Sequence, residues 1–388
     1  MPRAFDDRLL RCAALLAGAT CLTGVTLFVA AASRSPGGAA GSPVWPPGHW
    51  RAAIEVATVG AFVAYGIGLL LIARVRVSGR AVLAIAVAIQ LMPLTGPLLL
   101  STDAGTYVAY GRASQPYLGP NASVYGPLWT IISAPFSRFG DGIFALRSLA
   151  AASALALVAF AWRLATHKAL AAAFVGWNPL LALHAAGGGH NDALMMAFVL
   201  GALVLSRSGS RALGGAAWAA SIAVKWSSAP LFLLWAIAER RRRLSAEVAG
   251  ALACTALVAA AAFAVYGSGW LHVFSNISYQ SHRPTELGLA AWLHGLGLGH
   301  RLALRVTLLA ELISFGVFAV AAWHGRLRLG LAAVALAVLA TRLNAWYVIW
   351  GVALAAADDD DRWGRALAVA ATGYVLLDAI TTYVDVHP

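Results

Sequence analysis

One carboxylate in this chain of 388 residues is followed closely by aromatic hydroxyl groups. Asp103 lies directly after an apolar run, at the start of the polar segment 101–112. If this segment begins as a helix, Asp103, Tyr107 and Tyr110 share one face through i, i+4 and i+3 spacing. A carboxylate in that setting could take a proton from a hydroxyl group on an amphipathic substrate. The alternative is a helix N-cap beside a belt of interfacial tyrosines.

A second polar cluster follows a glycine-rich turn between two apolar runs. Three consecutive glycines at 187–189 permit a tight backbone turn, and His190, Asn191 and Asp192 come next. Asn191 or Asp192 could cap the helix that follows. Capping does not explain all three polar residues in a short turn with apolar walls, where each one needs a polar partner. We therefore expect this trio to belong to a functional site.

Lys225 lies inside the apolar stretch 212–238, between basic clusters that must share one side of a membrane. Two helices of about 12 residues are each too short to cross a bilayer core of about 30 Å, so we expect a re-entrant hairpin with Lys225 near its apex. A lysine there needs an anion nearby. The anion could be Asp192 or Glu311 within the protein, or the phosphate of a lipid.

Further candidate ligands come from three segments expected on one side of the membrane. In residues 119–129, glycines and prolines fix turns around Tyr125, and the aromatic rings suit contact with a sugar or headgroup. Arginine suits bidentate phosphate contacts and tryptophan faces suit sugars, although each could instead be an interfacial anchor. The candidates in segments 280–284 and 342–347 are His282, Arg283, Arg342, Trp346 and Tyr347.

The composition places these residues in a membrane protein. Hydrophobic residues make up 60% of the chain and charged residues 11%. Soluble proteins have about 45–50% and about 25%, so a soluble globular domain is excluded. The net charge of +12 would suggest a nucleic-acid partner in a soluble protein, but here it reflects membrane topology, and we expect no nucleic acid. The three cysteines show no metal-ligand or disulfide spacing.

Apolar windows bounded by charge, proline or glycine predict an all-α polytopic protein with about eleven spanning helices. The windows lie near residues 9–32, 52–73, 81–101, 142–165, 169–186, 191–206, 246–266, 302–323, 329–341, 345–357 and 364–383. The first is longer than the apolar run of a signal peptide, so we expect a retained anchor. With the N-terminus in the cytoplasm, lysine and arginine are about twice as frequent inside as outside.

We expect one integral-membrane domain in which two long outer loops form the active site. Its parts are an N-terminal three-helix part (1–101), a first outer loop (102–141), central helices (142–266), a second outer loop (267–301) and C-terminal helices (302–388). The acidic run 358–361 resembles a metal or nucleotide-sugar motif, but it lies in a short cytoplasmic loop. We interpret it as a solvated helix break.

Taken together, these residues resemble the bacterial polyprenol-phosphomannose-dependent α-1,6-mannosyltransferases and other GT-C integral-membrane glycosyltransferases. The resemblance covers roughly residues 90–355. The pieces that carry it are Thr102-Asp103 with Tyr107, Tyr110-Gly111-Arg112, Tyr125-Gly126-Pro127-Leu128, Asn178-Pro179, Gly189-His190-Asn191-Asp192-Ala193-Leu194-Met195, Ser221-Ile222-Ala223-Val224-Lys225 and Trp346-Tyr347-Val348-Ile349-Trp350. The most specific piece is the run from His190 to Met195.

The resemblance implies an inverting transfer of a sugar, foremost mannose, from a polyprenyl-phosphate donor to a glycolipid or glycan, with Asp103 as general base. The reaction would take place at the outer face of the cytoplasmic membrane. A polyprenyl phosphate leaves as a stable anion and needs no general acid, so one carboxylate can suffice. Cations then stabilise the growing charge, and we expect no metal and no cofactor.

The remaining candidates divide into two groups by chemistry. The expected ligands of the donor phosphate are Lys225, His282, Arg283 and Arg342. The expected ligands of the sugar or acceptor are Tyr107, Tyr110, Arg112, Tyr125, His190, Asn191, Asp192, Trp346 and Tyr347.

Two other functions fit parts of the sequence. A transporter or flippase of lipid-linked solutes usually has internal pseudo-symmetry and broken helices in both halves. Here one broken segment is visible and the polar residues gather at one face, which favours an enzyme. A GT-C transferase that uses another lipid-linked sugar is the second alternative, because sugar selectivity depends on a few hydrogen bonds.

Overall fold

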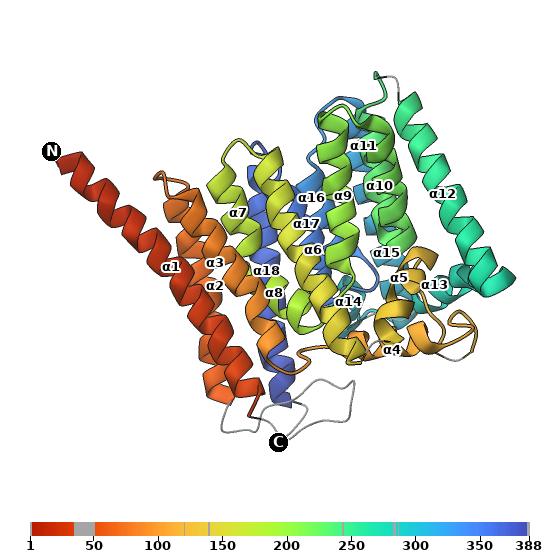
Figure 1. Ribbon diagram of the computed structural model, residues 1–388, viewed down its shortest axis with the longest axis horizontal. Helices are drawn as coiled ribbons and strands as arrows, with labels where there is room; N and C mark the ends of the chain where they lie inside the picture. The colour runs from red at the N-terminus through yellow and green to blue at the C-terminus, as the bar shows by residue number, and fades with distance from the viewer. Residues whose placement is uncertain are drawn as a thin grey trace.

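The computed structural model describes residues 2–34, 51–119, 121–138, 140–242, 244–281, 285 and 287–385, and within these ranges it contains helices and no strand. Figure 1 shows a helical body with α1 at one edge and α12 at the other, in which α16 and α17 lie partly behind α6 and α9. The long helices are α1 (Pro2–Ala32), α2 (Arg51–Ile72), α6 (Gly142–Leu164), α9 (Asp192–Arg207), α12 (Ser245–Tyr266), α15 (His300–Trp323) and α18 (Arg362–Asp385). The all-α prediction is therefore confirmed.

Among the described residues, five helices are long and apolar enough to cross a membrane, namely α1, α2, α6, α12 and α15. A sixth span results if the bent pair α7 (Lys168–Gly176) and α8 (Pro179–Ala182), which continues into the π-helix η3 (Leu183–Gly187), is one segment. The expected count of about eleven spans is not confirmed.

Length accounts for part of the difference. The windows expected near 81–101, 329–341 and 345–357 contain α3 (Gly79–Leu91), α16 (Leu329–Leu339) and α17 (Val348–Ala356), with 13, 11 and 9 residues. At 1.5 Å per residue each is about 20 Å long or shorter, against a core of about 30 Å. Their apolar composition fits helices buried among other helices equally well.

The stretch expected to form a re-entrant hairpin consists of two short helices. α10 (Arg211–Val224) ends at Lys225, whose backbone is extended, and α11 (Ala229–Ala238) follows the 3-10 turn η4 (Trp226–Ser228). The chain therefore breaks at Lys225, as expected. Entry and exit of this pair at the same membrane face stays a prediction.

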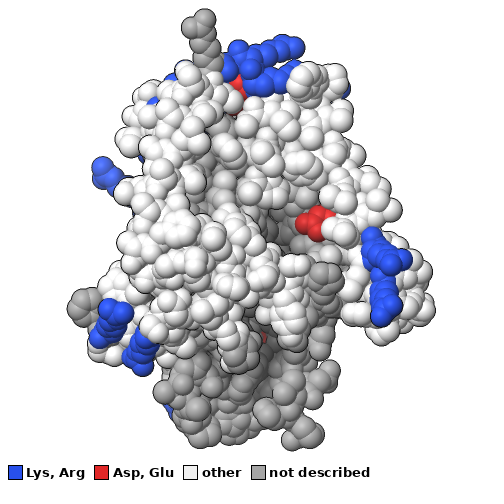
Figure 2. Space-filling model, turned by 90° about the vertical axis from the view of Figure 1, so that its right-hand side faces the viewer, with Lys and Arg blue, Asp and Glu red and all other residues white. Residues whose placement is uncertain are grey.

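The two long loops that are expected at the outer face contain short helices that gather at one end of the molecule (Figure 1). They are α4 (Asp103–Arg112), α5 (Pro127–Arg138), η5 (Gly267–His272), α13 (Val273–Ser281) and α14 (Leu289–Gly295). The connection between α11 and α12 lies at the opposite end. In Figure 2 the lysine and arginine side chains lie toward the ends and edges of the visible face, and most of its middle is uncharged, as in a membrane protein.

The acidic run 358–361 has a structural role that differs from a solvated break. Asp359 accepts hydrogen bonds from the backbone N–H groups of Thr166, at 2.5 Å, and His167, before α7. Burial alone would raise the pKa of Asp359, but these N–H groups bring it below its ordinary value. Asp361 is buried and accepts from Leu331 in α16 and Gly364 in α18. These two carboxylates therefore connect the starts of three helices.

Candidate active site

Asp103 is the first residue of α4, and the chain approaches it through a strained turn. Leu100 has a φ of 57°, in the left-handed region, which costs a non-glycine residue about 1–3 kcal/mol. The N–H of Leu99 donates to the carbonyl of Gly187, and the N–H of Asp103 donates to the Ser101 hydroxyl. The turn that precedes Asp103 is therefore bound directly to the glycine-rich turn that precedes His190.

Three side chains surround one oxygen of the Asp103 carboxylate. The Tyr107 hydroxyl donates to Oδ2 over 3.2 Å, and the Tyr125 hydroxyl donates to it over 3.3 Å. His190 Nδ1 lies 3.2 Å from the same oxygen, at ion-pair distance but without hydrogen-bond geometry. Among the described residues no such contact goes to Oδ1. Asp103 is thus held through one oxygen while the other is left for a ligand.

Electrostatics around Asp103 favour its ionised form. Burial alone would raise the pKa of this carboxylate, but the His190 ring, the Lys225 ammonium and the Tyr107 hydroxyl bring the pKa below its ordinary value. A carboxylate with these neighbours is a base at neutral pH rather than an acid.

The glycine-rich turn places His190 and Asn191 behind this carboxylate. Gly189 has a φ of +74°, and a Cβ atom there would lie 3.0 Å from that of Ala104, so the turn needs glycine. His190 stacks on Trp346, with ring centroids 3.7 Å apart. Asn191 Oδ1 lies 3.4 Å from the Tyr107 hydroxyl oxygen. Two members of the predicted trio, His190 and Asn191, therefore lie beside Asp103 and Tyr107.

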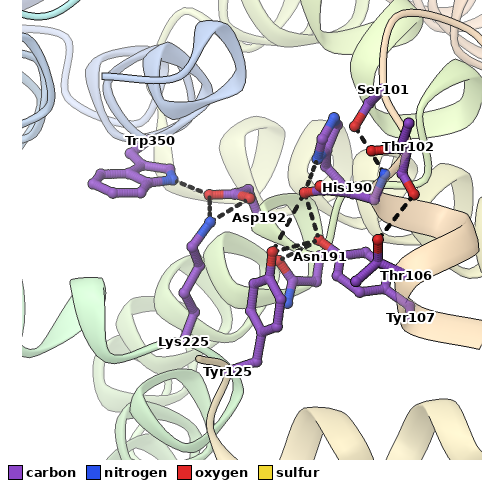
Figure 3. A network of polar contacts seen from close by, with 11 residues as sticks. Ser101, Thr102, Thr106, Tyr107, Tyr125, His190, Asn191, Asp192, Lys225 and Trp350 are labelled. Carbon is purple, nitrogen blue, oxygen red and sulfur yellow. Dashed lines mark hydrogen bonds and ion pairs between the residues drawn. The ribbon is translucent and has the colours of Figure 1, made fainter. Parts of the chain in front are cut away.

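Asp192 and Lys225 form a buried ion pair next to this cluster (Figure 3). Lys225 Nζ lies 2.8 Å from both carboxylate oxygens, and the Trp350 indole N–H donates to Oδ1 over 2.7 Å. Nζ also lies 4.5 Å from the centre of the Tyr347 ring. Of the anions that the sequence left open for Lys225, the structure shows Asp192.

Tyr125 reaches the site because its loop lies directly on the end of α10. The N–H of Gly126 donates to the Val224 carbonyl, one residue before Lys225. A Cβ at position 126 would lie 2.1 Å from the Ala223 backbone oxygen, so this contact needs glycine. The Tyr-Gly-Pro turn thus sets Tyr125 beside both Asp103 and Lys225.

These groups face a cavity of about 520 Å³, which is large enough for a small ligand. The predicted site residues in its lining are Asp103, Tyr110, Tyr125, Lys225, Arg342, Trp346 and Tyr347. Arg342 donates from Nη1 to Gln280 Oε1 over 2.5 Å, which connects α13 to the segment before η6 (Ala345–Tyr347). Helices α11 and α16 contribute apolar walls through Leu231 and Leu336.

Other predicted residues lie outside this lining. Tyr107, His190, Asn191 and Asp192 are buried behind it. Arg112 donates from Nε to the carbonyl of Ser137 near the end of α5, where it closes that helix. His282 and Arg283 lie outside the described residues.

Arg147 in α6 is a residue of the site region that the sequence patterns did not single out. It is buried, and its guanidinium donates to the carbonyls of Ala186, Gly96 and Pro93. These carbonyls belong to η3 and to the 3-10 turn η2 (Met92–Thr95) with the residue after it. Arg147 therefore joins the two turns that lead to His190 and Asp103. Its position within an apolar helix was the available signal.

Comparison with known proteins agrees with this geometry. A family model described as "Alpha-(1->6)-mannopyranosyltransferase, N-terminal domain" matches residues 119–240, which include Tyr125, the glycine-rich turn and Lys225. "Alpha-(1->6)-mannopyranosyltransferase A" of Mycobacterium tuberculosis (strain ATCC 25618 / H37Rv) is 30% identical over 359 residues, which covers 75% of this chain and 69% of the relative. This chain belongs to the α-(1→6)-mannopyranosyltransferase family. The resemblance seen in the sequence is thereby confirmed, and no solved structure matches the chain.

Within this mannopyranosyltransferase chain, Asp103 lies before the segment that the family model matches, and the ion pair of Asp192 and Lys225 lies inside it. The glycosyltransferase class and the apolar helices agree with an enzyme of the membrane.

Proposed function

We propose that this protein transfers mannose from a polyprenyl-phosphate donor to a glycolipid or glycan acceptor, with inversion, at the outer face of the cytoplasmic membrane. One observation carries the proposal. One cavity between apolar helices is lined by two cations, Lys225 and Arg342, and by two carboxylates, of which Asp103 has a pKa below its ordinary value. A sugar phosphate on a lipid anchor matches this combination of one base, two cations and apolar walls.

Asp103 would act as the general base. Its Oδ2 is occupied by Tyr107, Tyr125 and His190, so Oδ1 is the oxygen that receives the proton of the acceptor hydroxyl. The oxygen that loses this proton attacks the anomeric carbon from the side opposite the phosphate. Inversion follows, and a β-linked mannosyl donor yields an α-mannoside.

The cations would stabilise the leaving phosphate. An ammonium group has three N–H donors. The two Asp192 oxygens occupy two donors of Lys225, which leaves one for a phosphate oxygen in the cavity. The Arg342 guanidinium has five donors and uses one on Gln280. In a site with little water these donors lower the energy of the developing anion without a general acid.

The aromatic lining would hold the sugar rings. Tyr110, Tyr125, Trp346 and Tyr347 lie in the wall of the same cavity, and aromatic faces suit the apolar faces of sugars. Tyr107, His190, Asn191 and Asp192 lie behind this wall, so we assign them to positioning Asp103 and Lys225 rather than to direct contact with sugar.

The test is transfer of mannose by purified protein from a lipid-linked mannosyl phosphate to a mannoside acceptor. Asp103→Asn keeps the size of the side chain but removes the base, so we expect kcat to fall by about 10²–10⁴-fold. Asp141→Asn is the matched control, because Asp141 caps α6 through Phe144 N–H and asparagine caps equally well. Turnover in Asp103→Asn equal to that of the control would remove Asp103 as the base.

A further inference from the structure

Glu311 is a carboxylate that the proposed mechanism does not use. It is the twelfth of the 24 residues of α15, halfway along a helix that is long and apolar enough to cross a membrane. Its side chain is half-buried and lines the same cavity as Asp103.

Glu311 has no hydrogen-bond or ion-pair partner within the part of the chain that the structure describes. Neither described cation of the cavity lining contacts Glu311, because Lys225 pairs with Asp192 and Arg342 donates to Gln280. An ionisable residue without a partner inside a membrane is costly, and such residues generally serve a ligand. The structure therefore has a carboxylate that requires a partner from the cavity.

The chemistry of the cavity limits what that partner is. A phosphate in this cavity is attracted to Lys225 and Arg342 and repelled by the Glu311 carboxylate, and a cationic ligand is repelled by the two cations of the same lining. A neutral ligand with hydroxyl groups remains. Gln280 and Asn344 supply amide groups in the same wall, and Trp226 supplies an aromatic surface. Hydroxyl groups paired with a carboxylate and amides, against aromatic faces, are typical of a bound sugar.

We propose that Glu311 accepts hydrogen bonds from hydroxyl groups of a hexopyranose in this cavity and thereby contributes to the choice of sugar. The inference rests on the proposed function, since it names a ligand contact of the same site. The sugar is either the mannosyl group of the donor or the terminal sugar of the acceptor. Both present the same hydroxyl chemistry, and the experiment separates them.

The experiment tests whether the Glu311 side chain interacts with individual hydroxyl groups of the sugar. Purified wild type, Glu311→Gln and Glu311→Ala are assayed with the mannosyl donor and with donors that lack one hydroxyl each, and then with the matching deoxy acceptors. A site that binds a hydroxyl group rejects the analogue without it, because its own polar group is left unpaired. We expect at least one deoxy sugar to lower kcat/KM of the wild type by about 10²-fold or more.

In Glu311→Ala the same deoxy sugar should react within about threefold of its parent, because the partner of the missing hydroxyl is already gone. Glu311→Gln, which still accepts a hydrogen bond, should show an intermediate ratio and provides the test if the alanine variant does not fold. The series in which the ratio changes, donor or acceptor, identifies the sugar. Leu312→Ala, at an exposed neighbour on α15, is the control and should keep the wild-type ratios.

The inference is overturned if the ratio of kcat/KM between each parent sugar and its deoxy analogue is the same in both Glu311 variants as in the wild type. That result would leave the proposed transferase function unaffected. Failure of the wild type to transfer mannose from a lipid phosphate would instead overturn the proposed function. The two failures are therefore distinguishable in one set of assays.

Discussion

Replacing Lys225 by methionine removes one half of a buried ion pair and is the most demanding test of the site. Lys225 Nζ lies 2.8 Å from both oxygens of Asp192, and neither residue is exposed. The Coulomb attraction at 2.8 Å is about 6 kcal/mol at an effective dielectric constant of about 20. Desolvation of the two charges offsets much of this attraction. Removing one partner leaves the other charge buried alone, so we expect Lys225→Met to lower the free energy of unfolding by about 3–5 kcal/mol.

The double variant Lys225→Met with Asp192→Asn replaces the pair by two neutral groups. Asparagine Oδ1 can still accept the hydrogen bond that the Trp350 indole donates to Asp192. A buried pair exchanged for neutral groups of similar volume often loses little stability. We therefore expect the double variant to lie within about 2 kcal/mol of the wild type and to be more stable than Lys225→Met alone.

The assay is unfolding of the purified protein in mixed micelles by a denaturing detergent, followed by circular dichroism. Lys168→Met is the matched control, because Lys168 is the other lysine of the chain and is exposed. It should change the free energy of unfolding by about 0.5 kcal/mol or less. The reasoning is refuted if the double variant is destabilised as much as the sum of the two single variants, since the charges would then not be coupled.

The same variants separate the structural role of Lys225 from its proposed contact with phosphate. If the third N–H of the ammonium stabilises the leaving phosphate, the stable double variant should still lose about 10²–10³-fold in kcat. Wild-type turnover in a folded double variant would leave Lys225 with a structural role alone.

Three further predictions concern other residues of the site and its supporting turns. Tyr107→Phe removes a hydrogen-bond donor to Asp103, so the pKa of this carboxylate should rise. Because only the ionised base is active, the acid limb of the pH profile of kcat/KM should move to higher pH, and an unmoved limb contradicts this prediction. Arg147→Met leaves three backbone carbonyls without their hydrogen-bond donor and should lower the free energy of unfolding by about 3 kcal/mol or more. Arg147→Lys should lower this free energy less. Gly126→Ala brings a Cβ to 2.1 Å from a backbone oxygen of α10 and should lower the free energy of unfolding by about 1–3 kcal/mol. Gly60→Ala is the control and should cause no loss, because a Cβ at position 60 meets nothing within 4 Å.

Local patterns in the sequence predicted the parts of this structure that depend on neighbouring residues. The helical class and the positions of most apolar helices follow from hydropathy and periodicity, which act over a few turns. The contact between Tyr107 and Asp103 follows from i, i+4 spacing within α4. The break at Lys225 follows from the length of its apolar stretch. Each of these signals is contained within about one element.

Contacts between distant segments could not be predicted in the same way. Lys225 could pair with Asp192, with Glu311 or with a lipid, and the choice depends on how α9 and α10 pack. The number of membrane spans could not be predicted from composition either. An apolar helix of 11 residues such as α16 has the composition of a membrane span without its length. An apolar composition shows that a helix has apolar surroundings, but it does not distinguish lipid from the interior of the protein.

The breaks in the helices explain why the site forms where it does. The chain leaves helical geometry before Asp103, before His190, at Lys225 and before Trp346. Each break frees backbone N–H and C=O groups, which in a membrane need protein partners or a water-filled cavity. The break before Asp103 is bonded to the break before His190 through Leu99, and both are bonded to Arg147. Because breaks satisfy one another, they gather in one place, and the polar side chains that they carry are brought to one cavity. Interruptions of apolar helices are therefore the positions at which further site residues of such a chain should be sought.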